Sequence, residues 1–380
     1  MNATAPKPLP GWLLLLIACH AWGDWNEGAE AFRLGDYDAA FQEWHALAEQ
    51  GNAYGQYNTG IMYYKGLGIL PDKEQALKWL RKSAARGNVD SMYALGYMYH
   101  EGHGTAGDHA QAAQWYRQAA ERGNTSAQFN LGLLLDNDKQ SLQDNNEAMR
   151  WFVKAAENGV PQAQLKLGHI YSDGDGREQN DKQALQWYRM AADQGSAEAQ
   201  FRIGRIVASG GDPGGYSRAV EWYTRAAKQG HSEAQLNLGL LYKKGEGVDQ
   251  DYVAAFRWLS KAAENGNATA QFNLGLMYQK GTGVQHNDAE AVRWYLGAAA
   301  RGHAKAQNNL GYMYGMGYGV PQDYVRAHTW YNLAGANGID IAIDNRDKMA
   351  AEMTPDQIAE AQRLAHVRSM NMSGHEGNRR

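Results

Sequence analysis

The sequence predicts an all-α fold, an α/α superhelical solenoid of about eight to nine helix-turn-helix repeats. A tryptophan stands eight residues before a glycine in unit after unit, and apolar residues between these marks recur at helical spacing. Self-similarity of this period is typical of arrays whose units bury a core only by stacking. The glycines follow one another at intervals of 36 residues, with one interval of 35, at Gly51, Gly87, Gly123, Gly159, Gly195, Gly230, Gly266, Gly302 and Gly338.

Each repeat reads as two helices joined by a glycine turn. In residues 267–302 the first helix carries Ala270 and Tyr278 on one face, since they are eight residues apart. Gly281 and the glycine two residues later end that helix. The second helix begins near Asn287 and ends before the closing glycine, the expected left-handed C′ residue.

Helix caps recur in register with the tryptophans. Seven residues before them stand strong N-cap residues, interrupted only by Gly215. The predicted caps are Asp72, Asp108, Asp144, Asn180, Asp251, Asn287 and Asp323. Three residues further on, a capping-box partner is present in five repeats, as Gln75, Gln111, Glu147, Gln183 and Glu290.

A glycine also lies inside every predicted first helix, where it costs about 1 kcal/mol relative to alanine. Its regular return predicts a packing reason, and we expect the repeat tryptophan to lie against it. These glycines are Gly60, Gly96, Gly132, Gly168, Gly204, Gly239, Gly275 and Gly311. We number the repeats one to eight in this order.

The domain organisation follows from these marks. Residues 24–51 form an atypical N-terminal helical repeat, because Trp44 is one place out of register. Residues 52–338 form eight repeats of 35–36 residues. Residues 339–367 are expected to form capping helices, and residues 368–380 a flexible tail.

The first 23 residues resemble a signal peptide, with a short apolar run that cannot span a bilayer. Leu16 to Cys19 resembles the lipobox of bacterial lipoproteins, which makes Cys19 a candidate for lipidation. Ordinary cleavage before Asp24, with release into the periplasm, is the alternative. His20 after the cysteine favours sorting to the outer membrane by the same resemblance.

Composition argues against several function classes. The net charge of −4 and the absence of a lysine- and arginine-rich run argue against nucleic acid as a partner, and one cysteine cannot form an internal disulfide. His100, His103 and His109 cluster in a glycine loop without the spacing of a zinc motif. Residues 173–176 begin like a calcium loop but lack its final glutamate. We therefore expect no metal, no cofactor and no catalytic residue.

The consensus AxAQxNLGxMYxxGxGVxQDYxxAxxWYxxAAExG resembles the Sel1-like repeat, a relative of the tetratricopeptide repeat. The resemblance covers about residues 24–365 and departs from the pattern in the loops 135–146 and 209–215. It implies a protein that binds other proteins, in some cases in bacterial envelopes and in others as an immunity protein against a toxic effector.

A candidate binding face lies on the first helices, at positions three before, one after and four after the glycine. It is too apolar for a solvent face, so it either packs against neighbouring first helices or forms a groove for a partner. Its candidate residues are Tyr57, Tyr64, Tyr93, Tyr97, His100, His169, Arg205 and Tyr312, flanked by Arg202, Asn237, Asn273 and Asn309.

The sequence thus predicts a periplasmic scaffold or adaptor that binds a partner protein in the concave groove and is not an enzyme. Lipidation of Cys19 would anchor it at the outer membrane. The alternatives are an immunity protein that neutralises a secreted enzyme such as a lipase, and a glycan-binding or hydrolytic envelope enzyme.

Overall fold

The computed structural model describes residues 25–137, 142–174, 178–210 and 214–377. Within these ranges the chain is helical and contains no β-strand, so the predicted all-α solenoid of helix-turn-helix repeats is confirmed. The chain divides into two compact parts, residues 1–167 and residues 168–380, which we call the N-terminal and C-terminal parts. The expected signal peptide and Cys19 lie outside the described residues.

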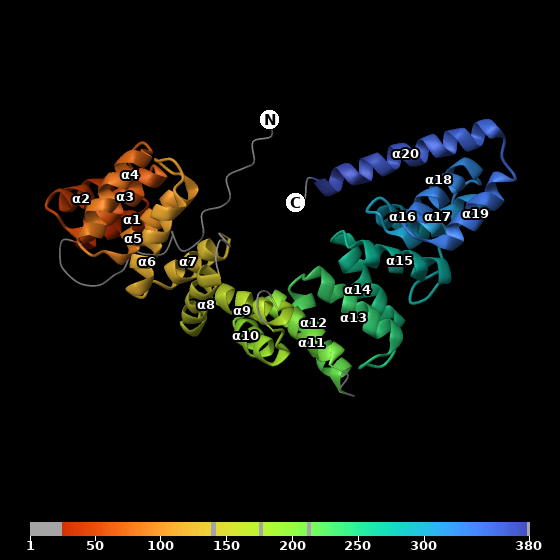
Figure 1. Ribbon diagram of the computed structural model, residues 1–380, viewed down its shortest axis with the longest axis horizontal. Helices are drawn as coiled ribbons and strands as arrows, with labels where there is room; N and C mark the ends of the chain where they lie inside the picture. Colours follow the sequence, from red (N-terminus) through yellow and green to blue (C-terminus); the bar gives the residue numbers. More distant parts are fainter. Residues whose placement is uncertain (1–24, 138–141, 175–177, 211–213, 378–380) are drawn as a thin grey trace. The chain divides into compact units, whose positions relative to one another are not determined.

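In the N-terminal part the helices follow one another as antiparallel neighbours (Figure 1). The first two precede repeat one, and from α3 onward each odd-numbered helix opens a repeat. They are α1 (Trp25–Leu34), α2 (Tyr37–Glu49), α3 (Ala53–Lys65), α4 (Lys73–Ala85), α5 (Val89–Glu101), α6 (His109–Glu121), α7 (Thr125–Asn137), α8 (Leu142–Glu157) and α9 (Pro161–Asp173), the last of which spans the division.

The C-terminal part continues the same alternation and ends with two helices outside the repeat pattern (Figure 1). Its helices are α10 (Asp181–Asp193), α11 (Ala197–Ser209), α12 (Gly215–Lys228), α13 (Ser232–Lys244), α14 (Tyr252–Glu264), α15 (Ala268–Lys280), α16 (Asp288–Ala299), α17 (Ala304–Met316), α18 (Tyr324–Ala336), α19 (Asp340–Ala350) and α20 (Pro355–Gly377).

The predicted second-helix caps form in six of seven cases. In each, the Asp or Asn side chain accepts a hydrogen bond from a backbone N–H in the first turn, which satisfies a donor that the helix leaves unpaired. Asp144 is the exception, because α8 already begins at Leu142 and places it inside the helix. Residues 142–157 contain no glycine or proline that would delay the start. The confirmed caps are Asp72, Asp108, Asn180, Asp251, Asn287 and Asp323.

The mid-helix glycines face a different residue from the one expected. A Cβ added at Gly96 would lie 2.5 Å from Cδ1 of Tyr116, the residue after the repeat tryptophan, and not against Trp115. The tryptophan itself is half-buried in most repeats and lies under a cation, as where Lys261 Nζ is 4.7 Å from the Trp258 ring centre. The residues that fill this position are Leu80, Tyr116, Phe152, Tyr188, Tyr223, Leu259, Tyr295 and Tyr331.

A buried glutamine joins consecutive repeats. Near the start of the first helix, Gln128 donates through Nε2 to the carbonyl oxygen of Ala120, in the second helix of the preceding repeat, over 3.2 Å. Its Oε1 accepts from Asn158, at the end of its own repeat's second helix, over 3.2 Å. Helix ends leave carbonyl groups unpaired, so this amide fixes the junction. The same backbone bond is made by Gln56, Gln164, Gln200, Gln235, Gln271 and Gln307.

The glycine turns form a second junction. At Gly283 φ is +73°, and a Cβ there would lie 2.1 Å from the carbonyl oxygen of Tyr252, at the start of the preceding repeat's second helix. Only glycine permits both the left-handed backbone and this close approach. The turn of one repeat therefore rests on the backbone of the repeat before it.

The C-terminal end of the described chain is helical. Thr354 and Gln357 exchange two hydrogen bonds in a capping box that starts α20, and the helix continues to Gly377. It packs on α18, where Thr329 Oγ1 donates to the Ala361 carbonyl oxygen over 3.2 Å (Figure 1). Within the described ranges, every helix falls short of the length or apolarity that a membrane span requires.

Candidate protein-binding surface

Several candidate residues of the N-terminal part lie between repeats one and two. Tyr57 and Tyr93 are buried, with 9% and 3% of their surface exposed, in one hydrophobic core. Burial raises the pKa of both phenols, and the Tyr93 hydroxyl accepts a hydrogen bond from Asn130 of repeat three over 3.1 Å. These tyrosines pack neighbouring first helices together, which is the first of the two explanations that the sequence left open.

Tyr64, Tyr97 and His100 are half-buried at the same junction. The Tyr64 hydroxyl is hydrogen-bonded to His103 Nδ1 at 2.8 Å, and the Tyr97 ring lies edge-on to the same imidazole with ring centres 5.9 Å apart. His100 contacts the rings of His109 and Tyr116. No group of three His, Cys, Asp or Glu residues in the described part of the chain is arranged to hold a metal ion.

The flanking row of polar residues also forms junctions. Asn237 and Asn309 hydrogen-bond to Tyr223 and Tyr295, the buried tyrosines that follow the tryptophan in the preceding repeat. Burial raises the pKa of each of these phenols to about 12, and the amide opposes the rise. A buried hydroxyl without a partner would cost about 1–3 kcal/mol, so this row contributes to stability.

Arg202 and His169 have partners inside the C-terminal part. Glu198 accepts from Arg202 at 2.6 Å and lies 2.8 Å from His231 Nε2. These two bonds hold the pKa of Glu198 at about 2, well below its usual range, against the opposing effect of burial. His169 Nδ1 is hydrogen-bonded to the Tyr188 hydroxyl at 3.0 Å.

Two of the candidates, Arg205 and Tyr312, are exposed on the first helices of the C-terminal part. Arg205 lies near Tyr223, whose pKa is raised by burial and lowered in part by the guanidinium charge. Tyr312 exposes 44% of its surface, and its ring centre is 5.7 Å from that of Tyr318 in the following turn.

The sequence did not predict two lysines of these helices, the half-buried Lys243 and the exposed Lys280. Lys243 Nζ donates a hydrogen bond over 2.9 Å to Oδ1 of Asn273, a candidate residue of the next repeat. Burial lowers the pKa of Lys243, and the charges of Lys280 and Lys244 lower it further, so these ammonium groups lie close together. Lys243 was missed because the position four residues after the glycine holds Tyr, His, Asp, Ser and Ala in the five preceding repeats.

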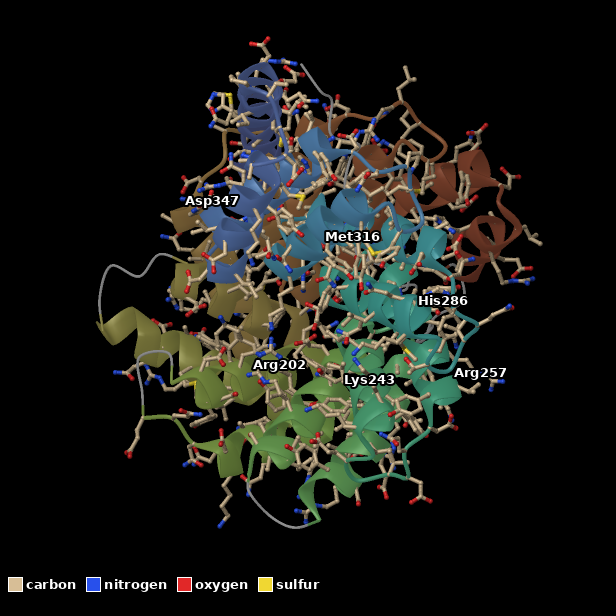
Figure 2. The ribbon with its side chains drawn as sticks, turned by 90° about the vertical axis from the view of Figure 1, so that its right-hand side faces the viewer. Arg202, Lys243, Arg257, His286, Met316 and Asp347 are labelled. Atoms are coloured by element: carbon tan, nitrogen blue, oxygen red, sulfur yellow. The ribbon has the colours of Figure 1, made fainter. Side chains whose placement is uncertain are left out.

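Met316 completes this group at the end of α17, with 50% of its surface exposed. Positions one, four and five after the glycine share one side of a helix, because residues three and four apart are neighbours. In Figure 2, Arg202, Lys243 and Met316 lie inward of Arg257, which projects from α14 at the margin. We call the following set the first-helix face of the C-terminal part: Arg205, Leu240, Lys243, Leu276, Lys280, Tyr312 and Met316.

Comparison with known proteins identifies the repeat. The family model described as Sel1 repeat matches eight consecutive segments, residues 53–88, 89–124, 125–160, 161–196, 197–231, 232–267, 268–303 and 304–339. The chain is a Sel1 repeat protein. The expected family resemblance is thereby confirmed, and the matches cover both the N-terminal and the C-terminal part.

Two solved Sel1 repeat structures resemble this Sel1 repeat protein over most of its length. A protective antigen of uropathogenic Escherichia coli strains is 30% identical, with a TM-score of 0.60, and the match covers 93% of this chain and 85% of that one. A Sel1 repeat protein from Oxalobacter formigenes is 29% identical, with a TM-score of 0.66, over 87% of this chain and 95% of that one. No curated protein matches the chain.

An immunity protein from Pseudomonas aeruginosa is more distant. It is 21% identical with a TM-score of 0.33, and the match covers 59% of this chain and 84% of that one, so it carries no argument about a partner here. Sel1 repeat proteins bind other proteins, and their solenoid is typically a non-catalytic interaction scaffold. The chain accordingly has the fold of a protein-interaction scaffold.

Proposed function

We propose that this Sel1 repeat protein is an adaptor of the bacterial cell envelope that holds a partner protein along the concave, first-helix side of its repeats. The second helices bury their alanines against the first helices and place the tryptophans under cations. On the first helices of the C-terminal part, Arg205, Lys280, Tyr312 and Met316 remain exposed at positions that vary between repeats.

The observation that carries the proposal is the composition of the first-helix face of the C-terminal part. It combines exposed Tyr312 and Met316 with Arg205 and two lysines over half-buried leucines. Tyrosine and arginine are frequent anchors of protein interfaces, and aliphatic residues beneath them provide apolar area to bury. In a solvated helix face one expects such large apolar side chains singly and not at successive repeats.

The envelope location rests on residues 1–23, whose apolar run and Cys19 have the pattern of an exported lipoprotein. The description of the Escherichia coli relative as a protective antigen agrees with this location. Lipidation is tested by palmitate labelling of the full chain. Incorporation should disappear in Cys19→Ser, and an unlabelled wild-type protein beginning at Asp24 would contradict the anchor.

Binding is tested by photocrosslinking in cells. A photoreactive phenylalanine analogue at Leu276 or Tyr312 should link the protein to one discrete partner. The same analogue at Arg257 or Lys228, which are exposed on second helices, should not. Crosslinks that arise only from the second-helix positions would refute the assignment of the face. The identity of the linked protein separates an adaptor, which would hold an envelope component, from an immunity protein, which would hold a toxic enzyme.

A further inference from the structure

Three cations on the first-helix face of the C-terminal part form no salt bridge with any of the described residues. In contrast to Arg202, which pairs with Glu198, and Lys244, which lies 3.5 Å from Glu246, none of Arg205, Lys243 and Lys280 has a carboxylate within salt-bridge distance among the described residues. Arg205 and Lys280 are exposed and Lys243 is half-buried, and the three occur in consecutive repeats on one side of the helices. Their charges therefore add to a positive strip.

The strip has an order along the repeats. Arg205 stands in repeat five, Lys243 in repeat six and Lys280 in repeat seven, and repeat eight contributes Tyr312 and Met316 in their place. Leu240 and Leu276, which lie on the same side of α13 and α15 as these cations, are half-buried. Lys243 is held by its hydrogen bond to Asn273, and Lys280 lies close enough for its charge to act on Lys243.

We infer that this strip binds an extended acidic segment of a partner polypeptide, with carboxylates on Arg205, Lys243 and Lys280 and an apolar side chain of the segment against Tyr312 and Met316. The inference rests on the proposed function and adds the chemistry of the partner. Packed helices lie about 10 Å apart and an extended chain covers about 3.3 Å per residue, so a segment of about ten residues spans the strip.

The geometry favours a polypeptide over other polyanions. Nucleic-acid binding requires many phosphate contacts, whereas the strip offers one or two cations per repeat in a chain of net charge −4. Apolar residues alternating with cations instead match a peptide that alternates acidic and apolar side chains.

The test measures binding of a fluorescein-labelled peptide of alternating glutamate and leucine that ends in tryptophan, by fluorescence anisotropy with the purified full chain. Its matched controls carry glutamine for glutamate or glycine for tryptophan. Both should bind at least about tenfold more weakly, and binding of the acidic peptide should weaken as salt is added. Equal binding of the glutamine peptide overturns the inference.

Variants locate the site. Lys243→Glu and Lys280→Glu should each weaken binding about tenfold, and Tyr312→Ala should remove the preference for the terminal tryptophan. The control variants Arg257→Glu and Tyr252→Ala make the same changes at exposed positions of α14 and should bind as the wild type does. If a charge reversal disturbs folding, as shown by circular dichroism, Lys243→Gln and Lys280→Gln replace it and should still weaken binding. Loss of peptide binding in the α14 variants would contradict the location of the binding site on the first-helix face of the C-terminal part.

Two further arms separate the alternatives. Tighter binding of single-stranded DNA of equal charge, or of vesicles containing anionic lipid, overturns the polypeptide assignment. Failure of the acidic peptide in a protein that still crosslinks through Tyr312 in cells refutes this inference alone. Absence of crosslinks from the first-helix face refutes the proposed function as well.

Discussion

Substitution of Gly96 by alanine tests the packing at the centre of each repeat. The added Cβ would lie 2.5 Å from Cδ1, 2.7 Å from Cε1 and 3.0 Å from Cγ of Tyr116. The ring is 1% exposed and cannot move into solvent, so the clash must displace a helix or force an unfavourable rotamer. Overpacking of this kind costs about 1–3 kcal/mol, whereas alanine gains about 1 kcal/mol of helix propensity. We expect a net loss of up to about 2 kcal/mol in the local opening free energy.

The same substitution should change sign when the ring is absent. In a Tyr116→Ala background the clash disappears, and Gly96→Ala should stabilise α5 by about 1 kcal/mol through propensity alone. Because long repeat arrays need not unfold in one step, hydrogen exchange of the amides in α5 and α6 is the appropriate assay. Stabilisation by Gly96→Ala in the wild-type background would show that the glycine is not there for the tyrosine ring.

Three further predictions concern the junctions and pH. His303 caps α17 through Nδ1, and burial lowers the pKa of its imidazole. Its contribution to folding stability is therefore complete above the unfolded-state pKa and is lost as pH falls through the lower folded-state pKa. In His303→Asn this part of the acid destabilisation should vanish from thermal melts. Gly283→Ala should lower the melting temperature more than Gly302→Ala. Both glycines have positive φ, but only a Cβ at Gly283 would clash with the backbone of the preceding repeat. Equal losses of melting temperature would contradict this close approach. Glu198→Gln should remove stability that the wild type has above the unfolded carboxyl pKa and loses as pH falls towards about 2, as a comparison of urea midpoints across pH would show.

The repeat register could be predicted because its signals are local. An N-cap such as Asp251 and a left-handed glycine such as Gly302 act within a few residues of their own position, so sequence spacing carries over to structure. The early start of α8 at Leu142 has the same origin, because neither glycine nor proline occurs in residues 138–144 to delay it.

The residues that contact each helix face in neighbouring helices could not be predicted from the sequence in the same way. Trp115 and Tyr116 are consecutive, and helical spacing alone does not decide which of them meets Gly96. The apolar candidates Tyr57 and Tyr93 pack between repeats, which requires knowing how first helices approach one another. Lys243 gives no sequence signal of its own, since only its proximity to Lys280 in the next repeat makes it part of a positive strip.

The glutamine junction has a consequence for how such a chain can change in length. Each of these glutamines donates to a main-chain carbonyl, which every residue type supplies. Five of them also accept a hydrogen bond from the end of their own repeat: Gln128, Gln200, Gln235, Gln271 and Gln307. The boundary between two repeats therefore uses nearly the same atoms wherever it occurs. Duplication or loss of one whole repeat would join surfaces that already match, so the number of repeats, and with it the size of partner that the protein can hold, is free to vary without a redesign of the core.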